Sequence, residues 1–239
     1  MISPTVLFKD VFFIDKRQAI INILDKKVTW SALTGGCQRC FYVTDLASQP
    51  EVCKVVERVM KPLIDYVQAI YPSLVCAKLG ALQTLLKYPS QYKGHSHRLH
   101  SDYSSNYPKF APAQRPVSVI LALDPFEFMY LPHISQRRKD LVHLTVSAGH
   151  AVIFTEACLH LGGPNDSTKH LFRLFAYMVS CADHYPTNQV FKYSWKEADN
   201  DMDATIKYTK EKGGDECGDY GSDEDVDGDA DDGGGKPKK

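Results

Sequence analysis

Two side chains that commonly bind metal ions, His100 and Asp102, stand two residues apart in the sequence. If this segment is a β-strand, both side chains point to the same face, because alternate residues of a strand share a face. A histidine from a distant strand would complete a facial triad of two histidines and one carboxylate. Such a triad leaves coordination positions of an Fe(II) ion open for other molecules. His160, which follows a short apolar run and precedes a Gly-Gly-Pro turn, is the candidate for this third ligand.

A single arginine, Arg173, lies inside the apolar run from Leu171 to Val179. An unpaired charge in a buried strand costs several kcal/mol, so this guanidinium needs a partner. A carboxylate held by both arms of the guanidinium is the usual solution. Because the sequence offers no obvious acidic neighbour, we expect the carboxylate to belong to a bound ligand.

Each of these residues has an ordinary structural explanation when it is taken alone. With nine histidines and 29 acidic residues, roughly one His-x-acid pair is expected by chance. A lone His160 is more often a surface or core histidine, and a lone Arg173 is more often structural. The order of the whole set, with a strand-rich interval between its members, favours a functional site.

In this order and spacing, His100, Asp102, His160 and Arg173 resemble the Fe(II)/2-oxoglutarate-dependent dioxygenases. The segment from His160 to Ser167, HLGGPNDS, followed by Arg173, is similar to the phytanoyl-CoA-dioxygenase-like branch. The resemblance covers roughly residues 80 to 180. It implies a double-stranded β-helix, which is a jelly roll of the cupin type.

The resemblance also implies a set of cofactors and roles. Fe(II) would be held by His100, Asp102 and His160, with 2-oxoglutarate as co-substrate and ascorbate as a reductant. Arg173 would bind the far carboxylate of 2-oxoglutarate. Lys169 is the alternative anchor, and Tyr177, four residues beyond Arg173 on the same strand face, or Ser167 would add a contact. The expected reaction is hydroxylation of a substrate with release of succinate and CO2.

Several local details depart from relatives in this superfamily. His150 stands where many relatives have an acidic residue, and Leu174-Phe175 after Arg173 removes the Arg-x-Ser signature of the plant enzymes. Val179 replaces the second arginine of the nucleic-acid demethylases, so no specific nucleic-acid signal is present. Asp102, where halogenases have glycine or alanine, favours hydroxylation.

The remaining pattern predicts a mainly β protein with flanking helices. We expect helices over residues 16–27 and from a Ser48–Glu51 capping box to about Tyr71, the second packing as a brace on the outside of a sheet. Expected strands cover residues 41–43, 79–88, 92–100, 115–123, 126–131, 141–146, 151–154 and 171–179. Short strands separated by turns indicate an antiparallel jelly roll.

We predict an N-terminal helical and mixed support region over residues 1–76, an oxygenase core over 77–195 and a disordered acidic tail over 211–239. The tail contains 11 acidic and 4 basic residues, a net charge of −7, so residues 1–210 carry +6 of the total of −1. Such a low-complexity, polar segment buries too little apolar surface to fold. The acidic tail is a candidate contact for a basic partner.

The body suits a small-molecule or polypeptide substrate of anionic character. The expected rim consists of an aromatic loop, Tyr103 to Phe110, and a basic loop, His133 to Lys139, with His95, His97 and Arg98 beside them. A solvated loop without a binding role explains the same charges equally well.

The chain has no signal-peptide pattern and no apolar run long enough for a membrane span, so we expect an intracellular protein without membrane contact. Seven cysteines without framework spacing indicate reduced thiols. Cys37-Gln-Arg-Cys40 has no second pair, which favours a turn over a zinc site. Two alternatives to the dioxygenase stay open: a non-catalytic cupin-fold binding or scaffold protein, and an oxygen-using metalloenzyme that does not need 2-oxoglutarate.

Overall fold

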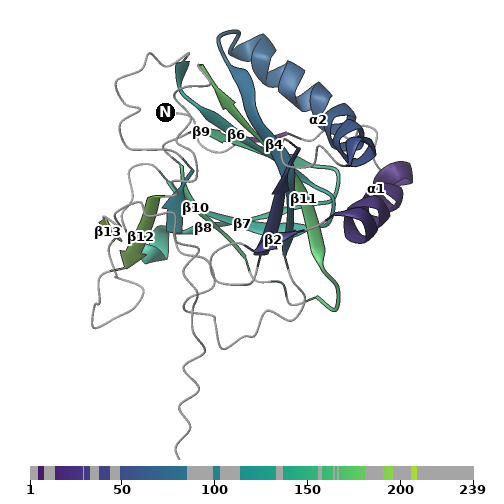
Figure 1. Ribbon diagram of the computed structural model, residues 1–239. Helices are drawn as coiled ribbons and strands as arrows, with labels where there is room; N and C mark the ends of the chain where they lie inside the picture. The colour runs from purple at the N-terminus through teal and green to yellow at the C-terminus, as the bar shows by residue number, and fades with distance from the viewer. Residues whose placement is uncertain are drawn as a thin grey trace, which may run out of the picture.

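Two antiparallel β-sheets lie face to face in this protein, with two helices outside one of them (Figure 1). The computed structural model describes residues 5–7, 14–28, 30–32, 38–43, 49–84, 99–102, 114–132, 137–155, 158–163, 165, 167–180, 191–195 and 206–208. The larger sheet has the strand order β1-β9-β6-β11-β4-β3-β2, and the smaller sheet has the order β13-β12-β5-β10-β7-β8.

The chain begins in the larger sheet with β1 to β4 and then passes repeatedly between the two sheets from β4 to β12. The bounds of the elements are β1 Thr5–Leu7, α1 Ile14–Lys27, β2 Ser31–Ala32, β3 Gln38–Tyr42, α2 Pro50–Ile70, β4 Val75–Thr84, β5 Leu99–Ser101, β6 Val117–Ala122, β7 Phe126–Leu131, the 3₁₀ turn η5 Arg138–Asp140, β8 Val142–Val146, β9 Ala151–Thr155, β10 Leu159–Gly162, β11 Leu171–Val179, β12 Phe191–Trp195 and β13 Ile206–Tyr208. Strands β4 to β11 supply four central strands to each sheet, which is the arrangement of a jelly roll.

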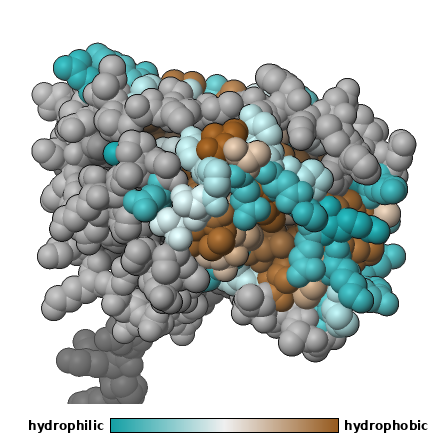
Figure 2. Space-filling view, turned by 90° about the horizontal axis from the view of Figure 1, so that it is seen from above, coloured by the Kyte–Doolittle hydropathy of each residue, from teal (hydrophilic) through white to brown (hydrophobic). Residues whose placement is uncertain are grey.

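The helices cover the outer face of the larger sheet. One stripe of α2 is buried against β4 and β11, with Val56 and Met60 fully enclosed. Leu24 of α1 joins the same core, as do Leu174 and Met178 from the outward face of β11. Figure 2, seen from above, shows hydrophilic residues running beside exposed hydrophobic ones on this side of the molecule. None of the described helices is long and apolar enough to span a membrane.

A second core fills the space between the sheets and is rich in aromatic rings. Phe175 of β11 packs there with Phe126 and Phe128 of β7 and Phe154 of β9. Gly80 of β4 allows the close approach of both β3 and Phe175, because a Cβ at Gly80 would clash with the backbone oxygen of Phe41 and would lie 2.8 Å from the Cζ atom of the Phe175 ring. The functional side chains described below lie in this inner layer.

The structure confirms the predicted mainly β architecture and most of its central elements. The bounds of β7 and β11 match the expectation, and α1 and α2 lie where the helical periodicity placed them. The strand expected over residues 79–88 instead begins at Val75, because its whole length pairs with β11. The predicted segments at 85–88 and 92–98 lie outside the described residues, as does the acidic tail.

Helix α2 does not begin as the expected capping box requires, because Gln49 and not Ser48 is its N-cap residue. The side chain of Gln49 forms no capping hydrogen bond, and Ser48 lies outside the described residues. Glu51 forms an ion pair with Lys27 at the end of α1, at 2.9 Å, instead of reaching back to cap its own helix. The contact between two helices therefore overrides the local motif.

Candidate metal centre

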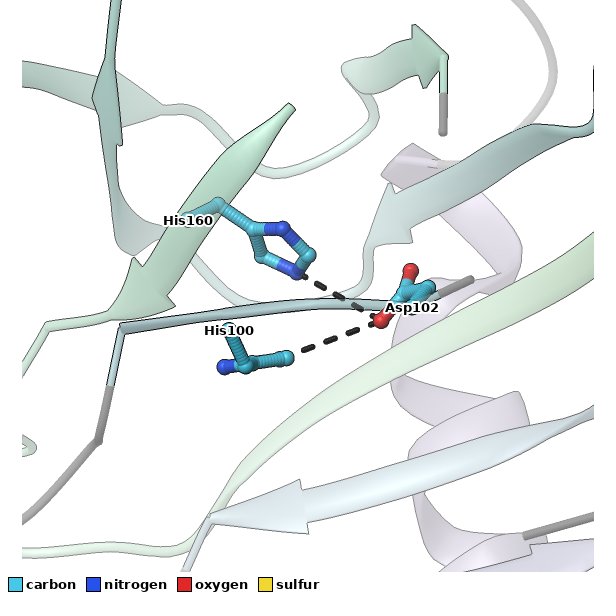
Figure 3. Close-up of side chains that lie close together, drawn as sticks. All are labelled: His100, Asp102 and His160. Carbon is cyan, nitrogen blue, oxygen red and sulfur yellow. Dashed lines mark ion pairs between the residues drawn. The ribbon is translucent and has the colours of Figure 1, made fainter. Parts of the chain in front are cut away.

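The side chains of His100, Asp102 and His160 come together between the two sheets (Figure 3). His100 lies on β5 and His160 on the neighbouring strand β10, and the two residues are direct partners in the antiparallel register. Asp102 follows the end of β5 and shares the face of His100. Their ligand atoms all lie within 4.8 Å of one another.

One oxygen of Asp102 faces both imidazoles. Its Oδ1 atom lies 3.6 Å from Nε2 of His160 and 3.8 Å from Nε2 of His100. The other oxygen, Oδ2, accepts a hydrogen bond of 2.6 Å from the hydroxyl of Ser118 on β6, in the opposite sheet. The carboxylate is therefore held on one side and directed at the histidines on the other.

His160 is held in a state suited to metal binding. Its Nδ1 atom lies 3.1 Å from the backbone oxygen of Cys158, so a proton on Nδ1 donates to that carbonyl and leaves the Nε2 lone pair facing Asp102. The ring packs against Phe128 and Phe154, with centroid distances of 5.3 and 4.5 Å. Burial, and then the neighbouring His100, lowers the pKa of His160 to about 4, so the imidazole is neutral near pH 7. A neutral imidazole whose second nitrogen donates to a carbonyl is the usual form of a histidine ligand.

These observations test whether the three residues fit a metal ion. Two imidazole nitrogens and one carboxylate oxygen converge on the same small volume, all within 4.8 Å of one another. This donor set suits a non-haem Fe(II) site that keeps coordination positions open. We conclude that the residues present fit such an ion.

Arg173 lies on the inner face of β11, further along the barrel from the triad. It is only 5% exposed, and its guanidinium carbon lies 4.7 Å from the centre of the Phe126 ring. Its Nη2 atom donates a hydrogen bond to the hydroxyl of Thr84 on β4. The aromatic face and the hydroxyl fix the direction of the guanidinium.

Lys169 and Ser167, the other predicted co-substrate contacts, have roles in the turn before β11. The ammonium of Lys169 lies 2.8 Å from the buried carboxylate of Asp124. Ser167 donates to Asn165, whose amide in turn donates to the backbone oxygen of Lys169 at 2.8 Å. These contacts tie the turn together and favour Arg173 as the cation available to a ligand between the sheets.

Tyr177 shares the inner face of β11 with Arg173 but lies at the level of the triad. It pairs in register with Ser118, the residue that binds Asp102. Phe175 lies between Arg173 and Tyr177 on the same face of β11, and its ring centroid is 5.2 Å from that of Tyr177. Arg173 and Tyr177, two of the co-substrate contacts predicted from the sequence, therefore lie on the same inner face of β11.

Sequence reasoning missed the residues that support these side chains, namely Ser118, Thr84 and Phe126. Ser118 carries a signal that could have identified it, because it is the one polar residue in the apolar run Val117–Leu123. Thr84 and Phe126 carry no comparable signal, since only the pairing of strands brings them to Arg173.

No protein-family model matches the chain, and a search of curated proteins finds no match. Comparison with solved structures, by contrast, finds the same fold in a group of 2-oxoglutarate and Fe(II) oxygenases. HygX from Streptomyces hygroscopicus, solved with nickel and 2-oxoglutarate bound, has a TM-score of 0.54 at 14% identity over 85% of this chain and 92% of its own. An oxidoreductase of the 2OG-Fe(II) oxygenase family from Burkholderia pseudomallei has a TM-score of 0.54 at 12% identity, covering 78% of this chain and 88% of its own.

A third similar structure is the non-haem α-ketoglutarate-dependent carbocyclase SnoK from nogalamycin biosynthesis. Its TM-score is 0.53 at 12% identity, and the alignment covers 79% of this chain and 81% of SnoK. At these identities the comparisons establish the fold, which is the jelly roll of these oxygenases.

Proposed function

We propose that this protein is an Fe(II)- and 2-oxoglutarate-dependent dioxygenase that hydroxylates its substrate with release of succinate and CO2. The observation that carries the proposal is the placement of four residues in one barrel. His100, Asp102 and His160 converge at one level of the inner layer, and Arg173 faces the same layer from β11. The shared fold with oxygenases that bind a metal and 2-oxoglutarate supports this reading.

Residues at one end of the site would bind the metal, and residues at the other end would bind the co-substrate. His100, Asp102 and His160 would hold Fe(II), and Arg173, directed by Thr84 and Phe126, would bind the far carboxylate of 2-oxoglutarate. When bound, the metal and the keto acid together supply the oxidising power of the reaction, since decarboxylation of the keto acid accompanies the activation of O2.

The apolar surroundings would exclude water and orient the reactants. Phe175 lies on the inner face between Arg173 and Tyr177, and Phe128 and Phe154 pack against His160. A dry site strengthens the charged contacts of the co-substrate and protects reactive species from side reactions. Within the superfamily, the segment from His160 to Asn165 and the position of Arg173 favour the phytanoyl-CoA-dioxygenase-like branch.

For the substrate we propose an anionic molecule, and Lys78 is the residue that supports this. Lys78 pairs with Tyr177, which pairs with Ser118, so the three residues form one row across β4, β11 and β6. The ammonium of Lys78 lies 4.5 Å from the centre of the Tyr42 ring, and Tyr42 packs edge-on against Phe175. A cation in this row of the larger sheet suits a carboxylate or phosphate bound between the sheets.

The expected outer rim of the site is only partly described. Arg137 before η5 and Lys139 within it are exposed, while His95, His97, Arg98 and residues 103–110 and 133–136 lie outside the described residues. The rim therefore remains a prediction from the sequence.

One assay separates this proposal from its two alternatives. Protein supplied with Fe(II), ascorbate and 2-oxoglutarate should release succinate, even without its substrate, because uncoupled turnover is common in this class. Metal binding without affinity for 2-oxoglutarate would favour an oxygen-using enzyme of another kind. The absence of both would favour a binding or scaffold protein.

Variants assign the metal ligands. His100→Ala, Asp102→Ala and His160→Ala should each abolish metal binding while the metal-free protein keeps its circular dichroism spectrum. His150→Ala and His170→Ala are matched controls near the same strands, and both should bind metal like the original protein. Retention of full affinity by His160→Ala would overturn the assignment.

A further inference from the structure

A buried serine from the opposite sheet is bound to the carboxylate of the candidate metal centre. Ser118 lies on β6 of the larger sheet and is 1% exposed, whereas Asp102 follows β5 of the smaller sheet. The hydroxyl of Ser118 donates to Oδ2 of Asp102 at 2.6 Å, so this hydrogen bond crosses the inner layer between the sheets. It is a charge-assisted bond of the short, strong kind.

The two oxygens of Asp102 have different surroundings, and this difference bears on how the carboxylate binds a metal. Oδ1 faces the Nε2 atoms of His160 and His100 at 3.6 and 3.8 Å, whereas Oδ2 is engaged by Ser118. A carboxylate free to rotate can offer both oxygens to one ion and so occupy two coordination positions. A donor fixed on Oδ2 keeps that oxygen turned away and presents Oδ1 alone.

We propose that Ser118 is a positioning residue that holds Asp102 as a single-oxygen ligand and thereby keeps one more coordination position open. This inference rests on the proposed metal centre. Its physical basis is the dependence of metal affinity on the partners of the ligands, whose loss typically weakens binding by about 10- to 100-fold. A serine with no role beyond satisfying a buried carboxylate would leave the coordination number unchanged when removed.

Among the described residues, the two that flank Ser118 in the larger sheet are poorly placed to replace its hydroxyl. In the sheet register Ser118 lies between Phe154 of β9 and Tyr177 of β11. Phe154 offers no hydrogen-bond donor from its side chain, and Tyr177 carries its hydroxyl at the far end of a ring that packs on Phe175. Loss of the Ser118 hydroxyl should therefore free the carboxylate to rotate.

The sharpest test replaces Ser118 with threonine and with valine. The two side chains have nearly the same shape and both suit a strand, but only threonine keeps the hydroxyl. A third variant, Ser118→Ala, removes only the hydroxyl group. Ser101→Ala is the matched control. Ser101 is a buried serine between His100 and Asp102 whose position in the strand alternation places it on the opposite face.

Full-length metal-free protein is titrated with Co(II), which serves as the probe for affinity and, through its visible absorption, for coordination number. We expect Ser118→Val and Ser118→Ala to weaken Co(II) binding by about 10- to 100-fold. We also expect the visible absorption bands of Co(II) bound to these two variants to weaken, because the carboxylate would occupy a second coordination position of the ion. Ser118→Thr and Ser101→Ala should match the original protein in both measurements.

The outcomes separate this inference from the function on which it rests. Equal affinity and equal spectra for the threonine and valine variants would overturn the role of Ser118 while leaving the metal centre intact. Failure of the original protein to bind Co(II) would overturn both. If Ser118→Ala fails to fold, the comparison of threonine with valine still decides the question.

Discussion

Removal of the Arg173 guanidinium should weaken 2-oxoglutarate binding far more than removal of any other cation near the site. Arg173 is 5% exposed and is directed by Thr84 and by the Phe126 ring. Deleting one partner of a buried, hydrogen-bonded charge pair costs about 2 to 5 kcal/mol. That cost corresponds to a dissociation constant raised by about 30- to 5,000-fold in Arg173→Ala.

Arg173→Lys should fall between the original protein and the alanine variant. Lysine keeps the charge but loses the planar fork, and the loss of one hydrogen bond to a charged group costs about 1.5 to 3 kcal/mol. Lys169→Ala should leave the dissociation constant unchanged, because the Lys169 ammonium is engaged by Asp124 at 2.8 Å.

Calorimetric titration of metal-loaded protein with 2-oxoglutarate measures these constants. A second ligand, 2-oxovalerate, keeps the keto-acid end but lacks the far carboxylate, so its weaker binding should not change in Arg173→Ala. If that variant weakened both ligands equally, or if Lys169→Ala had the larger defect, Arg173 would not be the anchor of the far carboxylate.

Three further predictions follow from packing and charge in the inner layer. Gly80→Ala should lower the free energy of unfolding by about 1 to 3 kcal/mol, because its Cβ would clash with the backbone oxygen of Phe41 and would lie 2.8 Å from the Phe175 ring. Trimming Phe175 to leucine should offset only part of this loss, because the contact with the Phe41 backbone would remain. Gly149→Ala, which has open space but a φ of +83°, should cost about 1 to 2 kcal/mol through backbone strain alone. Because burial holds the pKa of His160 near 4, below its unfolded value of about 6.5, the unfolded state binds more protons between these pH values. Urea unfolding of metal-free protein should therefore show a stability loss of about 3 kcal/mol as pH falls from 6.5 to 4, and His160→Gln should lack this component. Lys78→Met should reduce the stimulation of succinate release by carboxylate- or phosphate-bearing compounds but not by their uncharged esters, and equal losses for both would count against an anionic substrate.

The strands and helices that sequence reasoning located are those whose own residues determine them. The runs Val117–Ala122 and Leu171–Val179 are apolar except for Ser118 and Arg173 and therefore indicate buried strands, and the period of α2 is helical throughout. Strand β10 was not expected, because its four residues carry little preference of their own. It is held by β5 on one side and β7 on the other.

The candidate site divides in the same way. His100, Asp102, His160 and Arg173 could be proposed from the sequence because each residue type carries its own chemistry and their order is informative, and the structure brings the first three together. Thr84 and Ser118 could not be assigned roles, since a contact between residues far apart in the chain depends on strand register and on the packing of one sheet against the other.

The position of β10 between β5 and β7 has a consequence for folding of the protein during its synthesis on the ribosome. His100 and His160 are 60 residues apart in the chain, and both partners of β5, β10 and β12, are made after it. At about 5 to 20 residues per second, β5 waits about 3 to 12 seconds for β10 to be synthesised. During that interval the open edges of β5 and β7 can pair with other chains. A metal ion that bridges β5 and β10 would act on this late step by mass action, because it binds only after the strand has been inserted. Supply of the metal would then raise the yield of folded protein above the level that the metal-free chain reaches by itself.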